Sequence, residues 1–488
     1  MAIEHASSQQ LPLSCPASSR RFALCLSERR ILLLVVDLVM LSLALFAALR
    51  LRIPGVFLGH ATTAQFVAAR LEWWLLLGVL WFAFAAVAGC YDLRRAARAV
   101  EGAVHAAGCA LAVSALYLVV PVISAPLTRS RLGWSVFALL AALGVAGWRA
   151  LYARFLASHI FSRRILIVGA GFSARALAAA IDDLGPGSGV TVVGLVDDDP
   201  AKQNLHLGQV PVLGRCRRLA DLCAHSGVDE IVVAITHPGQ IQPHTVEALV
   251  RCWEAGVQIV PMSLYYEDLQ GALPVEHIGA NLFALVDRNG AIVTRLWDAA
   301  RRLIDLVAAA IGLLILAPFL PFIALAIRLD SRGPIFYQQV RVGLGGRSFI
   351  VHKFRSMVPD AERDGAQWSQ ESDPRVTRVG RWLRKTRLDE TPQLWNLLNG
   401  TMSLIGPRPE RPEFVDDLAQ LLPYYRIRHS IKPGITGWAQ VCYRYGNSVD
   451  DAKRKLEYDL YYIKRRGPVL DILIFLRTIR VVLQMQGT

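Results

Sequence analysis

Long apolar runs dominate the first third of the chain. They lie near residues 31–49, 73–89, 104–123 and 133–151. Each run is close to the roughly 20 residues that cross a bilayer as a helix. The denser arginine clusters beside the runs fall on one side, which is the cytoplasmic side in most membrane proteins; they comprise Arg29, Arg30, Arg94, Arg95, Arg98, Arg154, Arg163 and Arg164. The pattern predicts four transmembrane helices, with the amino terminus and the segment after the fourth helix in the cytoplasm.

After residue 164 the pattern changes to short apolar runs separated by longer stretches. The runs lie at 165–168, 190–196, 230–235 and 257–260. Repeated strand and helix units of this kind predict a Rossmann-like domain with a parallel sheet. Gly169 and Gly171 follow the first run and Asp197 closes the second, but Ala174 replaces the third glycine of the nucleotide-binding pattern. Two interpretations stay open: Gly169, Gly171 and Asp197 bind a nucleotide, or the domain is a scaffold without a ligand.

A fifth apolar run covers residues 303–327 and follows a basic segment at 295–302. Pro318 and Pro321 interrupt it, and a proline inside a helix costs about 3 kcal/mol or more. We expect a re-entrant pair of helices that breaks at these prolines and returns to its starting face. A proline-kinked fifth span is the alternative, and it would move everything after Asp330 away from cytoplasmic nucleotides. In both cases the basic segment would contact anionic lipid headgroups.

Composition supports a membrane protein. Of the 488 residues, 53% are hydrophobic, and the net charge is +14. Because the arginines cluster beside apolar runs and no nucleic-acid-binding signature appears, we expect membrane lipids and phosphate-bearing substrates as partners, and no nucleic acid. The eight cysteines form no CxxC pair and have no companion histidine at metal spacing, so we expect reduced, mostly buried thiols.

The last part of the chain contains an acidic pair, Asp389 and Glu390. Thr386 resembles the first residue of a capping box, and an apolar helix face follows and ends at Gly400. This arrangement predicts that the pair lies in the first turn of a helix, where a phosphoryl group can bind. Simple complementation of the helix dipole, worth about 0.3–1 kcal/mol, is the alternative. The pair also has many basic neighbours in sequence: Lys353, Arg355, Arg384, Arg387 and Arg408.

Four segments in this order resemble one known family. They are KFRSM at 353–357, LDETPQL at 388–394, IGPRPE at 405–410 and GITGWAQV at 434–441. Residues 295–482 resemble the bacterial sugar transferase family, the polyprenyl-phosphate hexose-1-phosphate transferases. The upstream helices and Rossmann-like insert resemble the long members that initiate exopolysaccharide or capsule synthesis.

The resemblance implies a phosphoglycosyl transferase with Asp389 as nucleophile and Glu390 as its partner, both expected to bind Mg²⁺. It implies that hexose-1-phosphate moves from a UDP-sugar to undecaprenyl (polyprenyl) phosphate through a covalent phosphosugar-Asp intermediate, with release of UMP. This is the first membrane step of exopolysaccharide, capsule or O-antigen synthesis, at the cytoplasmic face of the bacterial inner membrane. The long members also suggest a homodimer. The substrate-binding residues would be Lys353, Arg355, Arg384, Arg408 and Glu410.

Cys442, Tyr443 and Arg444 stand where many family members have Asn-Gly-Arg, so the transferred hexose stays open. One rival is a membrane-anchored nucleotide-sugar-modifying enzyme, but the Tyr-x-x-x-Lys pair that such chemistry normally needs is missing from the sequence. A second rival is a nucleotide sensor that uses the Rossmann-like domain. This function would not explain the acidic pair.

The expected fold combines an integral membrane α-helical bundle, a cytoplasmic α/β Rossmann-like domain, and a re-entrant membrane helix with a small, mainly helical catalytic domain. The expected parts are a cytoplasmic tail (1–28), a four-helix transmembrane domain (29–157), the Rossmann-like domain (158–290), an amphipathic and re-entrant helix (291–330) and the catalytic domain (331–488).

Overall fold

The chain forms two compact units, which are described separately. The first comprises residues 1–81 and 90–265, and the second comprises residues 82–89 and 266–488. The computed structural model describes residues 26–52, 63–119, 124–125, 131–160, 163–185, 189–203, 205–235, 241–277, 291–359, 361, 373–443, 446 and 448–483.

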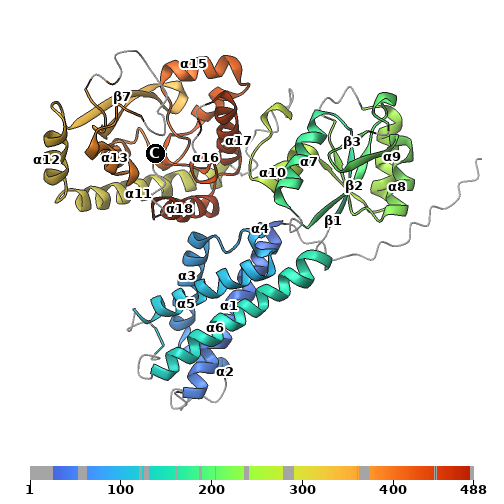
Figure 1. Cartoon of the computed structure of the whole chain (residues 1–488), viewed down its shortest axis with the longest axis horizontal. Coiled ribbons are helices and arrows are strands. Elements are labelled where there is room, and N and C mark those ends of the chain that lie inside the picture. The colour runs from blue at the N-terminus through green and yellow to red at the C-terminus, as the bar shows by residue number, and fades with distance from the viewer. Residues whose placement is uncertain are drawn as a thin grey trace, which may run out of the picture. The chain divides into compact units, whose positions relative to one another are not determined.

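Among the described residues, four single helices are long and apolar enough to cross a membrane, and Figure 1 shows how they are arranged. They are α1 (Leu26–Arg52), α3 (Leu71–Ala88), α5 (Ala99–Leu118) and α6 (Arg131–Leu151). Two short helices, α2 (Thr63–Ala69) and α4 (Leu93–Ala96), accompany them, and a π-helix (Tyr152–Ile160) continues α6. The four predicted apolar helices are therefore present. The third helix begins at Ala99, directly after Arg98 and five residues before the predicted residue 104. The predicted residues 120–123 lie outside the described ranges.

A buried ion pair joins α1 to α6. Arg149 Nη2 lies 2.5 Å from Asp37 Oδ2, and Arg149 Nε lies 3.2 Å from Asp37 Oδ1. The side chains are 1% and 0% exposed. A charge among apolar helices is expensive unless it is paired, so removal of either partner would leave an uncompensated buried charge. The hydrophobic pattern alone did not single out this pair, whose members lie 112 positions apart.

The Rossmann-like part contains a six-stranded sheet in the order β3-β4-β2-β1-β5-β6. Four strands match the predicted runs and pair in parallel: β1 (Arg163–Val168), β2 (Val190–Val196), β5 (Glu230–Val233) and β6 (Gln258–Pro261). The sequence pattern missed β3 (His206–Leu207) and β4 (Val210–Gly214), which pair with each other antiparallel. Strands this short carry too little alternation to be recognised.

Helices cover both faces of this sheet (Figure 1): α7 (Phe172–Leu184) lies on one face, and α8 (Leu219–Ser226) and α9 (Pro243–Glu254) lie on the other. Because both faces are covered, the central strand β1 is apolar at every position from Ile165 to Val168, and these four side chains are fully buried. Gly169 then turns the chain with φ of +100°, which favours glycine, and Gly171 precedes the first residue of α7.

The second unit contains the segment that was predicted to break at two prolines. Helix α11 (Ala291–Leu316) is followed by α12 (Leu320–Asp330), and the two are bent by 64° over residues 296–330. Pro318 lies in the connecting turn, and Pro321 lies in the first turn of α12, where its missing N–H is not needed. The predicted break is present, and its geometry fits both a re-entrant pair and a broken span.

The rest of the second unit is mainly helical and contains two small sheets. An antiparallel hairpin joins β7 (Phe336–Val342) to β8 (Ser348–Phe354), and β9 (Ser403–Ile405) pairs in parallel with β10 (Gly434–Thr436). The helices are α10 (Met262–Gln270), α13 (Arg378–Lys385), α14 (Leu394–Asn399), α15 (Pro412–Leu421), α16 (Trp438–Cys442), α17 (Val449–Arg465) and α18 (Pro468–Leu483). One apolar cluster packs α11 and β8 against α14, so α11 supports the hairpin.

Candidate active site

The acidic pair lies in a short 3-10 helix (Leu388–Gln393) that leads directly into α14. The predicted capping box is wrong. The Thr386 hydroxyl donates to the carbonyls of Trp382 and Leu383, so Thr386 ends α13 instead of starting the next helix. Arg387 starts it with a left-handed φ of 58°, an unfavourable conformation for a residue with a side chain. This sharp turn places Asp389 and Glu390 at the start of the 3-10 helix, and the predicted end of α14 at Gly400 is confirmed.

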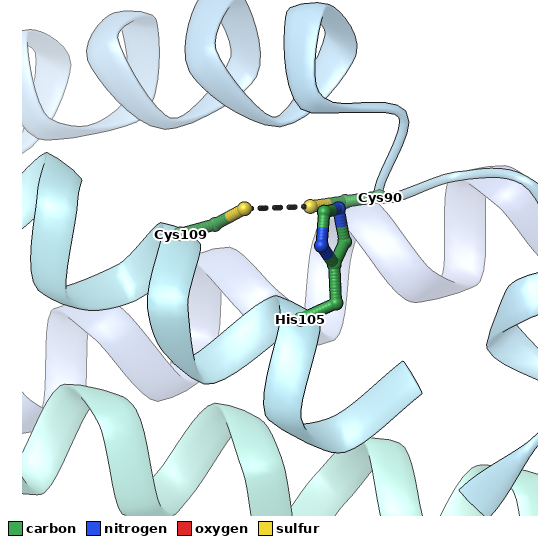
Figure 2. Close-up of side chains that lie close together, drawn as sticks. All are labelled: Cys90, His105 and Cys109. Carbon is green, nitrogen blue, oxygen red and sulfur yellow. Dashed lines mark hydrogen bonds between the residues drawn. The ribbon is translucent and has the colours of Figure 1, made fainter. Parts of the chain in front are cut away.

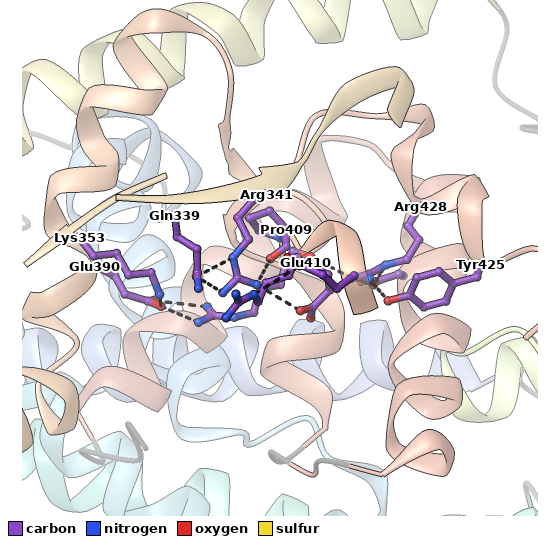
Figure 3. A network of polar contacts seen from close by, with 12 residues as sticks. Gln339, Arg341, Lys353, Glu390, Pro409, Glu410, Tyr425 and Arg428 are labelled. Carbon is purple, nitrogen blue, oxygen red and sulfur yellow. Dashed lines mark hydrogen bonds and ion pairs between the residues drawn. The ribbon is translucent and has the colours of Figure 1, made fainter. Parts of the chain in front are cut away.

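Glu390 is held by cations (Figure 3). Its Oε1 lies 3.0 Å from Lys353 Nζ and 2.6 Å from Arg408 Nη2, and Arg387 lies 3.9 Å from Oε2. Burial by itself would raise the pKa of Glu390, but Arg408 and Lys353 outweigh it and hold that pKa well below its usual range. These cations favour the ionised form of Glu390, which anchors basic side chains from β8 and from the segment after β9.

Asp389 has a different environment from its neighbour. Its side chain makes no hydrogen bond to the part of the chain that the structure describes, and it borders a cavity. Burial, followed by repulsion from the Glu390 carboxylate, raises the pKa of Asp389 to about 6, although Lys353 and Arg384 oppose this shift. The carboxylate is ionised at neutral pH and has no hydrogen-bond partner to displace before it could act as a nucleophile.

The cavity beside Asp389 has a volume of about 770 Å³. Basic side chains on its wall outnumber acidic ones; they are Arg341, Lys353, Arg355, Arg375, Arg384, Arg387, Arg408, Arg411, Arg428 and Lys455, against Asp389, Glu390, Glu410 and Asp459. Buried arginines and lysines bind phosphate oxygens through charge-assisted hydrogen bonds. A cavity with this charge balance suits a ligand with several negative charges.

A second network extends along the same wall (Figure 3). Arg341 donates to Gln339 Oε1 over 2.6 Å and to the Pro409 carbonyl over 3.2 Å, and it lies 3.4 Å from the Glu410 carboxylate. The backbone of Val342 also donates to the Glu410 carbonyl. These contacts fix the strand β7 to the Pro-Arg-Pro segment, so they orient Arg408 relative to the acidic pair.

A buried ion pair on the same wall, Arg428 with Asp459, supports the backbone of Arg408. Arg428 donates to Asp459 Oδ2 over 3.1 Å, to the Tyr425 hydroxyl over 2.6 Å and to the Arg408 carbonyl over 2.9 Å. Lys464 and Arg465, which follow Asp459 on α17, pair with Glu267.

The structure brings every predicted substrate-binding residue to the wall of this one cavity. Arg384 lies close to the acidic pair and donates to the Ser356 hydroxyl over 3.0 Å, while burial lowers its pKa. Arg355 differs from the others, since it donates to the carbonyls of Ser331 and Arg332 at the end of α12. Its guanidinium thus serves the local backbone in this arrangement, and substrate binding by Arg355 stays a prediction.

The acidic pair provides a suitable donor set for Mg²⁺. Two adjacent carboxylates are hard oxygen ligands of the kind that Mg²⁺ combines with substrate phosphates. Asp389 has no hydrogen-bond partner among the described residues, and Glu390 Oε2 has only long contacts, 3.5 Å to Arg408 and 3.9 Å to Arg387. The residues fit the ion that the resemblance implies.

The aspartate of the Rossmann-like turn in the first unit, unlike Asp389, has hydrogen-bond partners. Asp197 Oδ2 accepts a hydrogen bond of 2.7 Å from the backbone N–H of Ala170, between Gly169 and Gly171, and it lies 3.1 Å from Lys202 Nζ. The carboxylate of Asp197, one of the possible nucleotide-binding groups, is therefore already bound to the glycine turn. Nucleotide binding by these residues stays a prediction.

Comparisons with known proteins agree with the geometry of the second unit. The model of the family described as bacterial sugar transferase matches residues 296–485. A UDP-glucose:undecaprenyl-phosphate glucose-1-phosphate transferase from Caulobacter vibrioides is 39% identical over 209 residues, which are 42% of this chain and 78% of that protein. The chain belongs to the bacterial sugar transferase family.

Longer relatives of the family extend the similarity. A UDP-N-acetylgalactosamine-undecaprenyl-phosphate N-acetylgalactosaminephosphotransferase from Aeromonas hydrophila is 41% identical over 235 residues, which are 48% of this chain and 54% of that protein. An undecaprenyl-phosphate glucose phosphotransferase from Komagataeibacter xylinus is 37% identical over 328 residues, 65% of this chain and 59% of that protein. The matches thus span only about half the length of these relatives. A second family model, described as a CoA-binding domain, matches residues 86–261.

Proposed function

We propose that this member of the bacterial sugar transferase family is a phosphoglycosyl transferase. It moves hexose-1-phosphate from a UDP-sugar to undecaprenyl (polyprenyl) phosphate and releases UMP. The observation that supports the proposal most directly is that the two acidic residues differ in their contacts. Asp389 has no hydrogen-bond partner among the described residues, whereas Glu390 is fixed by Lys353 and Arg408.

In the first step a carboxylate oxygen of Asp389 attacks the sugar-linked phosphorus. The bond between this phosphorus and the bridging oxygen breaks, and its electron pair leaves on UMP. The product on the enzyme is a phosphosugar attached to Asp389 through an acyl phosphate. Lys353, Arg384 and Arg408 neutralise the diphosphate oxygens, which lowers the repulsion between an anionic nucleophile and an anionic substrate.

In the second step an oxygen of polyprenyl phosphate attacks the same phosphorus. The bond to Asp389 breaks, the carboxylate is restored, and polyprenyl-diphospho-sugar leaves. Division into two steps means that two highly charged substrates need not share the cavity. Asp389 and Glu390 would hold Mg²⁺, which screens phosphate charge when it is bound.

The decisive experiment is trapping of the intermediate with the full chain in detergent or nanodiscs. Incubation with a UDP-hexose and Mg²⁺ alone should add the mass of one hexose phosphate, and peptide mapping should place it on the segment that contains Asp389. Addition of undecaprenyl phosphate should remove the adduct and yield the lipid product. Release of UMP at full rate with no adduct on this segment under any quench would rule out the covalent route.

A panel of UDP-sugar donors would identify the hexose that is transferred. The names of the relatives cite glucose for some proteins and N-acetylgalactosamine for another. We therefore propose UMP release as the readout across UDP-sugars, because it reports the reaction and the donor together.

We further propose that α11 and α12 form a re-entrant pair and that the catalytic unit lies at the cytoplasmic face of the bacterial inner membrane. The 64° bend at the two prolines supports this arrangement. Single cysteines introduced at Ser7 and Thr488 in a background without accessible thiols should both be labelled only after the membrane is permeabilised. Labelling of the two ends from opposite faces would instead identify a broken fifth span. The homodimer expected from long family members stays a prediction.

A further inference from the structure

Two cysteines and a histidine meet in the first unit, outside everything used above (Figure 2). Cys90 lies in the turn after α3, and His105 and Cys109 lie one helical turn apart on α5. The ligand atoms of all three lie within 4.8 Å of one another, and the two sulfur atoms are 3.2 Å apart. The expectation that no cysteine has a companion histidine is thus wrong, because His105 and Cys109 at i and i+4 share one helix face.

The position of this group is fixed by its surroundings. Arg149, whose charge is balanced by Asp37, donates a hydrogen bond of 2.9 Å to the Cys90 carbonyl and so holds the turn. Both cysteines are buried, whereas His105 is half-buried. Ligands held by rigid helices and a fixed turn are pre-organised for an ion.

We propose that Cys90, His105 and Cys109 form a binding site for a thiophilic divalent cation of the Zn²⁺ type. Thiolate and imidazole ligands select such ions over Mg²⁺ or Ca²⁺, and three protein ligands leave a fourth tetrahedral position for water. On binding, the two thiols would release their protons to the solvent as the sulfur–metal bonds form.

Charge balance makes the site acceptable in an apolar bundle. Two thiolates neutralise one divalent cation, and Asp37 and Arg149 already neutralise each other. The occupied site therefore adds no net charge between helices that are apolar enough to cross a membrane. A bound ion would fasten the turn after α3 to α5.

One contact must change when the ion binds. Arg95 Nη1 lies 3.3 Å from His105 Nε2, and its Nε lies 3.7 Å from Glu101 Oε1. If Nε2 becomes a ligand, Arg95 loses that contact and keeps its carboxylate partner. The guanidinium is partly exposed, so this movement does not disturb the core.

A second cysteine pair provides a matched comparison. Cys223 and Cys252 are also buried and their sulfur atoms are 3.9 Å apart, but within the described ranges no histidine or carboxylate joins them in a metal-ligand group. Proximity of two thiols alone therefore does not define the proposed site. The histidine distinguishes it.

The test uses the full chain in nanodiscs, purified under reducing conditions. We expect about one Zn²⁺ per chain by elemental mass spectrometry. Replacement with Co²⁺ should give the thiolate-to-cobalt charge-transfer absorption, which carboxylates at the acidic pair cannot produce. Cys109→Ser should lower that absorption by about half or more, because Cys90 remains as the one thiolate ligand. His105→Ala should weaken Zn²⁺ binding about 10-fold or more, and Cys252→Ser should leave both signals unchanged.

Three results would overturn the proposal. The wild type could bind no Zn²⁺ or Co²⁺ above the acidic-pair background, Cys109→Ser could retain the full thiolate absorption of the wild type, or the reduced protein could reoxidise to a Cys90–Cys109 disulfide that excludes the metal. His105→Ala changes only a half-buried side chain, so a monodisperse preparation of this variant keeps the test valid if Cys109→Ser does not fold.

Discussion

Two turns of this chain, at Asp389 and at Asp197, each place an aspartate beside backbone N–H or basic groups of the kind that bind phosphate. The contacts of the two carboxylates are opposite. In the second unit Asp389 borders a basic cavity and has no hydrogen-bond partner among the described residues. In the first unit Asp197 accepts hydrogen bonds from the backbone of Ala170 and Asp199 and pairs with Lys202. One carboxylate is available for chemistry, and the other is part of the fold.

The difference comes from the neighbouring carboxylate in each turn. Glu390 binds Lys353 and Arg408, so these cations do not cap Asp389. Next to Asp197, the carboxylate of Asp198 accepts from Cys216, His244 and Thr245 and fastens α9 to the sheet. A motif therefore indicates a reactive group only when the donors within its reach are bound by other acceptors, as at Glu390, whereas Ala170 and Lys202 still bind Asp197.

Substitution of Asp389 by asparagine should have the largest effect. The change removes the nucleophile while keeping the shape, and we expect UMP release to fall by about 10³-fold or more. Single-turnover assays with a UDP-hexose and undecaprenyl phosphate measure this loss.

Asp416→Asn serves as the matched control, because Asp416 is exposed on α15 and pairs only with Arg426 at the surface among the described contacts. Its activity should equal that of the wild type. Full turnover by a folded Asp389→Asn protein would remove the distinction between the two turns.

Loss of a cation on Glu390 should have the next largest effect. Arg408→Gln removes the 2.6 Å contact and leaves a buried carboxylate with less compensation, and we expect kcat to fall about 10²- to 10³-fold. Arg408→Lys should recover only part of the rate, since lysine cannot reproduce a two-nitrogen contact. Equal rates for Arg408→Gln and the wild type would show that Glu390 alone positions the site.

The pH dependence should follow the raised pKa of Asp389. Because the carboxyl keeps its proton up to about pH 6, the nucleophile is lost as the pH falls through that value. We expect adduct formation to drop about tenfold per pH unit below pH 6. Higher Mg²⁺ concentrations should move this limb to lower pH, because the cation competes with the proton. An acid limb near pH 4 at low Mg²⁺, with the fold intact by circular dichroism, would contradict the burial argument.

Local patterns predicted the parts of the fold that local physics decides. The four apolar helices, the parallel strands of the Rossmann-like part and the break at Pro318 and Pro321 all follow from hydrophobic period, length and proline geometry. The ordered motifs also singled out Lys353, Asp389 and Arg408, and the structure places all three on the wall of one cavity. The capping box at Thr386 failed because Thr386 ends α13 and the left-handed Arg387 starts the next helix.

Partners far apart in sequence could not be predicted. Asp37 meets Arg149 across 112 positions, and Arg428 meets Asp459 across 31, and no spacing rule relates such pairs. The cluster at Cys90 combines both cases, since His105 and Cys109 have a recognisable helical spacing but Cys90 joins them only through the fold. Folding, not local sequence, brings these groups together.

Replacement of Asp197, whose carboxylate stabilises the glycine turn, should have the smallest effect on activity. Asp197→Ala removes the hydrogen bond from Ala170 and the contact with Lys202. The Rossmann-like part should therefore lose about 1–3 kcal/mol of stability. UMP release should stay within about twofold of the wild type, because Asp197 lies outside the cavity at Asp389. Hydrogen exchange of β1 and α7 measures the first quantity, and Asp182→Ala, an exposed position on α7, is the control. Because the wild-type carboxylate already occupies the glycine turn, NAD⁺, coenzyme A and UDP should not protect this region from exchange. Protection by one of them in the wild type that disappears in Asp197→Ala would identify Asp197 as a ligand-binding residue and make the two turns alike.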